Sequence, residues 1–167
     1  MSANLTSART PGAQADDTPR FRPMTESDLD AVMAIETVVY THPWTRGNFT
    51  DSFAAQSHCR VLEWHGVIVG YAVLTAGAGE AHLLNLSVAA AWQRRGLGRE
   101  LLDHVIALAR ALKVQKIFLK VRTSNTAARA LYTRSRFREI GVRRGYYPAQ
   151  TTREDAIVLE CLLGYAT

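Results

Sequence analysis

The sequence is poor in cysteine, with only Cys59 and Cys161 among 167 residues. Both cysteines lie in apolar, strand-like runs, which is typical of reduced core thiols in a cytoplasmic protein. The five histidines and two cysteines show no spacing that suits metal ligation. We therefore expect no metal site.

Long apolar runs are also missing. No stretch approaches the roughly 18 apolar residues that cross a bilayer, and the N-terminus lacks the apolar segment of a secretory signal. Hydrophobic residues make up 47% of the chain and charged residues 21%, as in ordinary globular proteins. We expect a cytoplasmic protein that does not contact a membrane.

Basic residues exceed acidic ones, giving a formal net charge of +5. The arginines cluster at 94–99, 134–138 and 143–144, but no helical segment has a continuous basic face with interleaved aromatics. The charge fits an anionic ligand or a nucleic-acid-rich environment. We do not expect direct binding to nucleic acid.

The first twenty residues are rich in small and polar types and have almost no large apolar side chains. Such a segment buries too little surface to offset the entropy of ordering, so we predict a disordered tail over 1–20. The remaining chain contains no internal repeat. We predict a single folded domain over 21–163.

Hydrophobic periodicity and turn residues predict a mixed α/β sheet. It is antiparallel where tight turns join strands and parallel where helices cross over. The predicted strands cover 21–24, 59–64, 67–75, 80–88, 114–121, 137–147 and 155–163. The predicted helices begin at 25, where Thr25 and Asp28 resemble a capping box, and at 45, 97 and 125.

The basic, glycine-rich turn at 93–99 (QRRGLGR) joins an apolar strand to an amphipathic helix. Its glycines let backbone N–H groups approach a ligand, and the helix N-terminus adds partial positive charge. The turn therefore suits a phosphate. The alternative interpretation is that the segment is an ordinary tight turn before a surface helix, with its arginines exposed to solvent.

Three segments in order carry a family resemblance: 83–88 (LLNLSV), 93–98 (QRRGLG) and 124–132 (SNTAARALY). Together the three resemble the GNAT superfamily of acetyl-CoA-dependent N-acetyltransferases. The segments 144–148 (RGYYP) and 153–156 (REDA) resemble its RimI type, which acetylates the N-terminal alanine of a small-subunit ribosomal protein. The resemblance implies about seven strands and four helices, with the sheet splayed between its fourth and fifth strands.

The resemblance also implies that acetyl-CoA binds along the splayed strand and the turn. The cofactor arm would add to the strand like a further strand, and the turn would wrap the pyrophosphate. The residues implied in cofactor binding are Leu86, Ser87, Val88, Arg94, Arg95, Gly96, Leu97, Gly98, Arg99 and Asn125.

Acetyl transfer to an amine needs an oxyanion donor, an acid for the leaving thiolate and an acceptor for the amine proton. The Val88 N–H is the expected oxyanion donor. Tyr132 occupies the family's acid position, and a tyrosine O–H suits a thiolate leaving group. The alternative interpretation is that Tyr132 only packs against other residues of its helix.

The proton acceptor departs from the family pattern, because Lys120 stands where the RimI type has a glutamate. An ammonium group cannot accept a proton, so Lys120 acts as a base only if it is desolvated and neutral. Glu80 could instead take the proton through water. The amine could also lose its proton to solvent, since an N-terminal α-amine has a pKa of about 7.7–8.0. The last two routes together are our prediction.

Aromatic residues are candidates for the peptide slot. Tyr146 and Tyr147 would form one wall, with Trp44 and Glu36 opposite; their alternative is ordinary packing. Two residues depart from the family pattern: Arg136 replaces a glycine at a helix end, and Gly145 replaces an asparagine in the presumed substrate loop.

The sequence therefore predicts a monomeric enzyme that transfers acetyl from acetyl-CoA to the N-terminal alanine of a ribosomal protein. A second hypothesis keeps the cofactor and changes the acceptor to a lysine or a small-molecule amine. A third is a non-catalytic acetyl-CoA-binding module, which Lys120 suggests and which Tyr132 and the intact phosphate turn oppose.

Overall fold

The computed structural model describes residues 17–164, so most of the predicted tail lies outside the described residues. Within these residues, seven strands form one sheet in the order β1-β2-β3-β4-β5-β7-β6. All neighbours are antiparallel except β4 and β5, which are parallel. The strands are β1 (Arg20–Pro23), β2 (His58–Trp64), β3 (Val67–Gly77), β4 (Glu80–Val88), β5 (Lys116–Arg122), β6 (Arg138–Pro148) and β7 (Arg153–Leu162).

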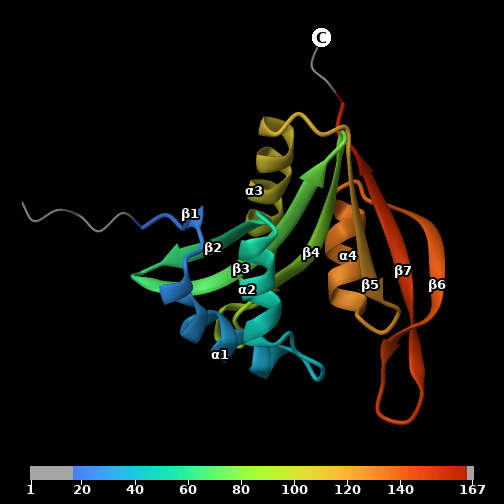
Figure 1. The fold of residues 1–167 in the computed structure, drawn as a ribbon, viewed down its shortest axis with the longest axis horizontal. Helices are drawn as coiled ribbons and strands as arrows, with labels where there is room; N and C mark the ends of the chain where they lie inside the picture. The colour runs from blue at the N-terminus through green and yellow to red at the C-terminus, as the bar shows by residue number, and fades with distance from the viewer. Residues whose placement is uncertain (1–16, 165–167) are drawn as a thin grey trace, which may run out of the picture.

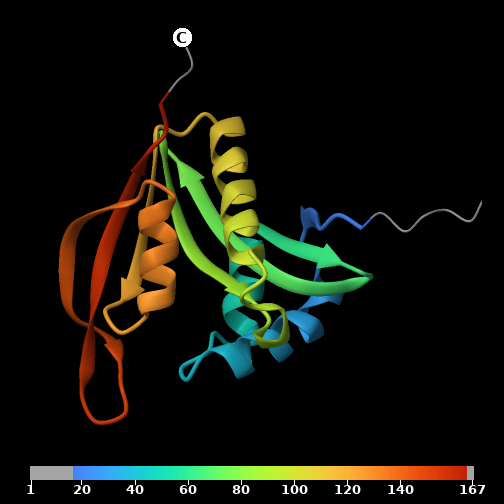
Figure 2. The same ribbon diagram turned by 180° about the vertical axis from the view of Figure 1, so that it is seen from behind.

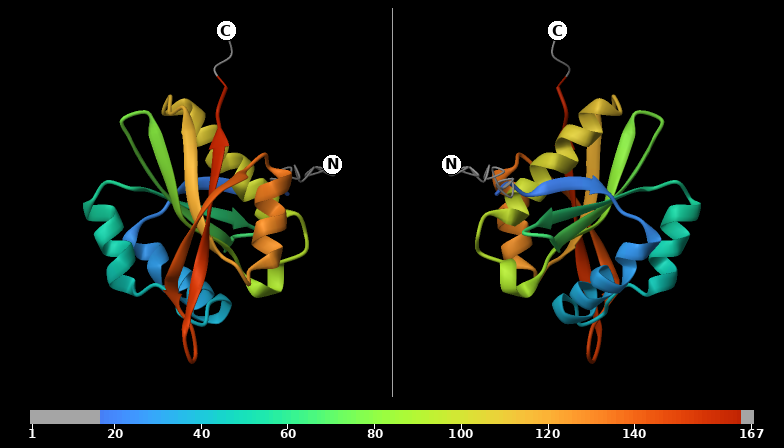
Figure 3. Two further views of the ribbon diagram at one scale, coloured as in Figure 1. Left: turned by 90° about the vertical axis from the view of Figure 1, so that its right-hand side faces the viewer. Right: turned by 90° about the vertical axis from the view of Figure 1, so that its left-hand side faces the viewer.

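Helices cover both faces of this sheet, as Figures 2 and 3 show. Residues of β3 alternate between two cores: Tyr71 and Val73 pack with α1 and α2, whereas Ala72 and Leu74 pack with α3. This alternation is the period-2 pattern of a strand buried on both sides. The helices are α1 (Leu29–Val39), α2 (Arg46–Ala54), α3 (Leu97–Ala111) and α4 (Thr126–Arg134), with short 3-10 turns at Glu26–Asp28 and Ala90–Trp92.

The parallel pair β4–β5 separates partway along its length. Its register runs only from Glu80 opposite Lys116 to Leu83 opposite Leu119. Beyond that point β5 stays paired with β7, and β4 stays paired with β3 after a bulge at Leu84. In Figure 1 the two strands leave a common point at the top and diverge downward. The predicted splay between the fourth and fifth strands is therefore confirmed.

Predicted strand ends differ from the structure by at most two residues, and the helix predicted to begin at Thr25 starts as the 3-10 turn Glu26–Asp28 before α1. The predicted strand at 114 begins at Lys116, because Val114 N still bonds Ala109 O at the helix end (3.3 Å). The last strand begins at Arg153, two residues earlier than predicted, because Arg153 pairs with Pro148 across the β6–β7 turn. No helix among residues 17–164 is long and apolar enough to cross a membrane.

Arg136 keeps the left-handed backbone of the glycine it replaces, with a φ of 68°. The helix end is retained, since Phe137 N bonds Tyr132 O at 3.0 Å and Arg136 N bonds Thr133 O at 3.2 Å. The departure from the family pattern therefore adds backbone strain and does not move the terminus of α4.

Because a left-handed φ costs an L-residue about 1–2 kcal/mol, Arg136→Gly should stabilise the protein by about 0.5–1 kcal/mol after the added entropy of the unfolded chain. A rise of about 2–3 °C in Tm is expected for a domain of this size. Ala130→Gly inside α4 is the matched control and should lower Tm. An unchanged or lower Tm for Arg136→Gly would contradict this account.

Asp28 is buried and joins the first turn to the sheet. It accepts two hydrogen bonds from Arg22 (2.9 and 3.0 Å) and one from Thr25 N (2.8 Å). The hydrogen bonds from Arg22 are the main cause that lowers the pKa of Asp28 to about 2, from an ordinary 3.8. A lowered folded-state pKa stabilises the fold above the unfolded pKa.

This stabilisation, about 2 kcal/mol, should be complete above pH 4 and lost as the pH falls from about 4 to about 2. Asp28→Asn should therefore lower the free energy of unfolding by about that amount at pH 7 and by much less at pH 2. Urea unfolding at both pH values measures it. Equal losses at both would show that packing, not charge, is responsible.

Candidate active site

Two cavities meet where β4 and β5 separate. The first, of about 330 Å³, opens towards α1 and the β6–β7 turn. The second, of about 810 Å³, opens towards the basic turn and α4. Residues that line both are Tyr40, His42, Leu86, Arg122, Asn125, Ala128 and Pro148. A ligand in one cavity can therefore touch a ligand in the other across the split sheet.

The open edge of β4 presents backbone groups to this junction. Leu86 O accepts from the Tyr40 hydroxyl (3.2 Å), and Val88 O accepts from Gln93 Nε2 (3.0 Å). These carbonyls therefore point away from β3. A strand residue directs its N–H and C=O to the same side, so the amides of Leu86 and Val88 also face the gap. These two N–H groups suit an extended ligand that has amide groups of its own.

The basic turn leaves the first amides of α3 without acceptors. Gly96 adopts a left-handed φ of 79° and precedes the helix without a side-chain cap. The first helical bond runs from Glu100 N to Gly96 O at 3.1 Å. The N–H groups of Leu97, Gly98 and Arg99 are therefore available to an anion. The side chain of Leu97 is buried in the core, so only its backbone can contribute.

The three arginines of the turn do not act alike. Arg94, with a φ of 63°, lines the second cavity. Arg95 stacks on the ring of Trp92 at 5.0 Å. Arg99 pairs with Asp103 at 3.1 Å and does not line either cavity described above. The second cavity is thus lined by the Arg94 side chain, and that all three arginines wrap a phosphate stays a prediction.

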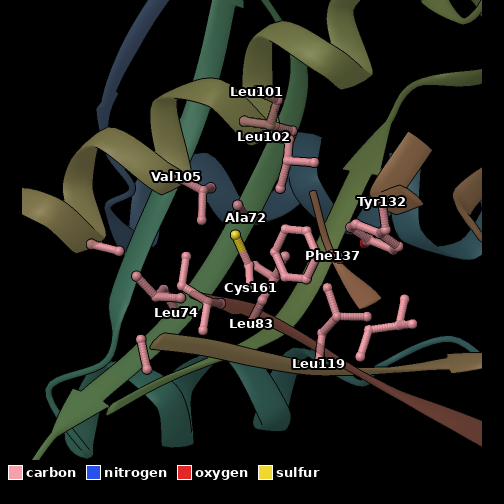
Figure 4. Packing of buried hydrophobic residues seen from close by; sticks show 14 of the residues in the cluster. Ala72, Leu74, Leu83, Leu101, Leu102, Val105, Leu119, Tyr132, Phe137 and Cys161 are labelled. Atoms are coloured by element: carbon pink, nitrogen blue, oxygen red, sulfur yellow. The ribbon is translucent and has the colours of Figure 1, made fainter. Parts of the chain in front are cut away.

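Helix α4 brings Asn125 and Tyr132 to the first cavity. Asn125 begins the helix, and its side-chain oxygen accepts from Ala128 N at 3.2 Å. Tyr132 is buried and packs edge-on against Phe137 (Figure 4). Burial raises the pKa of Tyr132 above its ordinary value. Among residues 17–164 no group hydrogen-bonds to its hydroxyl, which is therefore a free donor in the cavity.

The structure separates the two candidate bases. Lys120 lines the first cavity and lies 5.5 Å from the ring of Tyr146, but it is exposed. It therefore lacks the desolvation that a neutral lysine requires. Glu80 pairs with Lys116 at 3.5 Å at the closed end of the sheet. It lies six residues from Leu86, about 20 Å along the strand, so the prediction that it serves this site is wrong.

Glu36 is 1% exposed and holds the wall of the first cavity together. It accepts from Trp44 N (2.8 Å), from Asn85 Nδ2 (3.1 Å) and from the Tyr71 hydroxyl. Glu36, Trp44 and Tyr147 all line the first cavity. The Glu36 carboxylate, however, is engaged by three donors of the protein, so its part is to position Trp44 and β4.

Only one of the paired tyrosines faces the cavity. Tyr147 lines it beneath the Arg122 guanidinium (4.5 Å from the ring centroid), and burial raises the pKa of Tyr147 to about 12. Tyr146 is 47% exposed and lies outside the cavity lining. Arg122 also donates to Pro148 O at 2.9 Å, which ties the β6–β7 turn to β5.

Gly145 has a left-handed φ of 58°, and its N–H donates to Asp155 at 2.8 Å. Asparagine tolerates this backbone region better than most residues, so the replacement noted in the sequence conserves the local conformation.

Sequence reasoning missed Tyr40, Gln93 and Arg122. Gln93 lies inside the recognised turn, so its position was a signal that could have found it. Tyr40 and Arg122 carry no such signal, because each contacts residues at least 26 positions away.

Residues 29–137 match the Acetyltransferase (GNAT) family. The chain is 37% identical over 133 residues to the [ribosomal protein bS18]-alanine N-acetyltransferase of Escherichia coli K12, covering 80% of this chain and 90% of that protein. It is 35% identical over 136 residues to the corresponding protein of Salmonella typhimurium, covering 81% of this chain and 92% of that protein.

Solved structures agree in fold. The crystal structure of the ribosomal-protein-S18-alanine N-acetyltransferase from Escherichia coli has a TM-score of 0.84 and 33% identity, covering 90% of this chain and 97% of that chain. Arabidopsis thaliana Naa50 in complex with the bisubstrate analogue CoA-Ac-MVNAL has a TM-score of 0.75 and 21% identity, covering 87% and 99%. At that identity the second likeness concerns the fold alone.

Proposed function

Because the chain belongs to the GNAT family of acetyltransferases, we propose that this acetyl-CoA-dependent enzyme acetylates the N-terminal alanine of a small-subunit ribosomal protein. The acceptor is inferred from the Escherichia coli relative's name and its 37% identity over 80% of the chain. The observation that best supports acetyl transfer is that two cavities meet at the split sheet, since an acyl donor and an amine can approach from opposite sides.

The site residues fit the cofactor. The free amides of Leu86 and Val88 match an amide-containing arm laid along β4, and the uncapped start of α3 with Arg94 suits its pyrophosphate. Gly98 presents no side chain there, and a Cβ at this position would make an ordinary contact with Leu131 Cδ2, at 3.5 Å. When bound, acetyl-CoA supplies the activated acetyl group.

We assign two roles to the chain's own groups at the junction. The Val88 N–H donates to the carbonyl oxygen on which negative charge develops. The Tyr132 hydroxyl donates its proton to the leaving sulfur. The amine is free to lose its proton to water, since an N-terminal α-amine is partly neutral near pH 7.5.

Lys120 is the residue that departs most from the family pattern, and its exposure argues against a proton-transfer role. Lys120→Ala should therefore change kcat/KM for an alanine-initiated peptide by less than about 3-fold, because general-base catalysis contributes about 10²- to 10⁴-fold where it operates. Steady-state rates with that peptide give the answer. A loss of 100-fold or more would make Lys120 the base after all.

The acceptor is tested by intact-mass analysis of two peptides incubated with acetyl-CoA and the protein. One begins with a free alanine and the other has a blocked N-terminus and an internal lysine. A gain of one acetyl group on the first peptide alone supports the proposal. Equal or faster modification of the blocked peptide would contradict the proposed acceptor and leave the acetyltransferase activity intact.

A further inference from the structure

A series of buried hydrogen bonds, here called the Glu36–Asn85–Ser87 chain, runs from Glu36 on α1 to the junction of the two cavities. Asn85 Nδ2 donates to Glu36 Oε2 (3.1 Å), and Ser87 Oγ donates to Asn85 Oδ1 (3.0 Å). The Tyr40 hydroxyl lies 2.8 Å from Ser87 Oγ and 3.2 Å from Leu86 O. Glu36, Asn85 and Ser87 are all buried.

The carboxylate at one end sets the direction of every bond in this chain. An ionised carboxylate only accepts, so the amide of Asn85 must face it with its NH₂ group. The oxygen of Asn85 is then left to accept, and the Ser87 O–H must point to it. Ser87 Oγ, having used its proton, offers a lone pair to the Tyr40 O–H, and Leu86 O is also purely an acceptor.

The Tyr40 proton is therefore directed into the protein. The phenolic oxygen keeps its lone pairs for the cavities, both of which Tyr40 lines. The Tyr40 oxygen can therefore accept a hydrogen bond from a ligand, but it cannot donate one to a ligand. The donor common to every amine substrate is its N–H.

The position of Tyr40 also suits an attacking amine. Leu86 and Val88 are two residues apart, about 7 Å along a strand. An amine nitrogen about 3 Å from the Tyr40 oxygen and about 3 Å from a carbonyl carbon held at the Val88 N–H would span that separation.

We propose that Tyr40 positions the acceptor amine for attack by accepting a hydrogen bond from its N–H, in a direction set by the Glu36–Asn85–Ser87 chain. This inference rests on the proposed function, because it concerns the amine-binding side of the same site. Tyr40 holds the amine and takes no proton from it. Burial raises the pKa of Tyr40, which keeps the phenol neutral.

The test is Tyr40→Phe, which keeps the ring and removes the oxygen. We expect kcat/KM for the alanine peptide to fall about 10-fold, with the KM of acetyl-CoA unchanged and the pH profile unchanged in shape. Thr37→Val is the matched control: it removes an exposed hydroxyl from the same helix, bonded to Met33 O, and lines neither cavity. Its kinetics should equal those of the wild type.

A second variant, Ser87→Ala, leaves the Tyr40 oxygen in place and removes one of the two acceptors for its proton. We expect a smaller fall, about 2- to 3-fold, because Leu86 O still holds the O–H. Thermal unfolding of each variant separates loss of fold from loss of positioning.

Several outcomes would overturn the inference. An unchanged kcat/KM in Tyr40→Phe means that the amine does not bind this oxygen. A raised KM for acetyl-CoA alone means that Tyr40 acts on the cofactor strand, and loss of the basic limb of the pH profile means that it is a base. If the wild type leaves the alanine peptide unmodified, the proposed acceptor is wrong, and Tyr40→Phe is compared on the lysine peptide.

Discussion

Tyr132→Phe is expected to lower kcat about 100-fold while leaving the KM of acetyl-CoA within about 2-fold of the wild type. A positioned acid contributes about 10²- to 10⁴-fold, and the buried Tyr132 hydroxyl is the one free donor that α4 presents to the first cavity among the described residues. Phenylalanine keeps the edge-on packing against Phe137, so the fold should be unaffected.

Single-turnover rates with saturating acetyl-CoA measure this effect directly. Thr133→Val is the matched control, since it removes an exposed hydroxyl of the same helix that bonds Arg129 O. Because burial raises the pKa of Tyr132, the O–H stays protonated, and kcat of the wild type should not decline up to about pH 10. A variant that retains more than a third of wild-type kcat would remove Tyr132 from the acid role.

Gly98→Asp should weaken acetyl-CoA binding about 100-fold and at the same time raise Tm. Gly98 is the second residue of α3, where its free N–H lies at the second cavity. A carboxylate there opposes a bound pyrophosphate: two like charges about 4 Å apart repel by about 4 kcal/mol at an intermediate dielectric, less when screened by salt. The same carboxylate stabilises the start of the helix.

Opposite effects on binding and stability make this experiment informative. Calorimetric titration with acetyl-CoA gives the Kd, and thermal unfolding gives Tm. Gly98→Asn, of nearly the same size and without charge, should lose less than about 5-fold in affinity. Equal losses in Gly98→Asp and Gly98→Asn would mean that the side chain blocks the cavity and that the pyrophosphate lies elsewhere.

Local sequence was sufficient for the elements of the fold and for part of the site. The turn at 93–99 joins a strand directly to a helix, and the segment from Asn125 to Tyr132 lies within one helix and its cap. Spacing alone therefore places the residues of each segment relative to one another. The split between β4 and β5 could be expected only through family resemblance, because it depends on a bulge at Leu84 and on pairing with β3 and β7.

Residues that act across elements could not be assigned from sequence. Glu80 shares a strand with Val88, yet the extended backbone carries it about 25 Å away, to the closed end of the sheet. Tyr146 and Tyr147 are adjacent, and two extra residues of β6 between Arg143 and Tyr147 decide that only Tyr147 faces the cavity.

The sequence by itself therefore determined the order of strands and helices, the basic, glycine-rich turn and the helix that carries Asn125 and Tyr132, because these depend on periodicity and on residues near one another in the chain. Tertiary structure alone decided that Glu36 is a buried positioning group, that Glu80 is remote and that Tyr40 lies at the junction of the cavities. Those outcomes depend on which distant groups share one buried space, where each polar atom must find a partner.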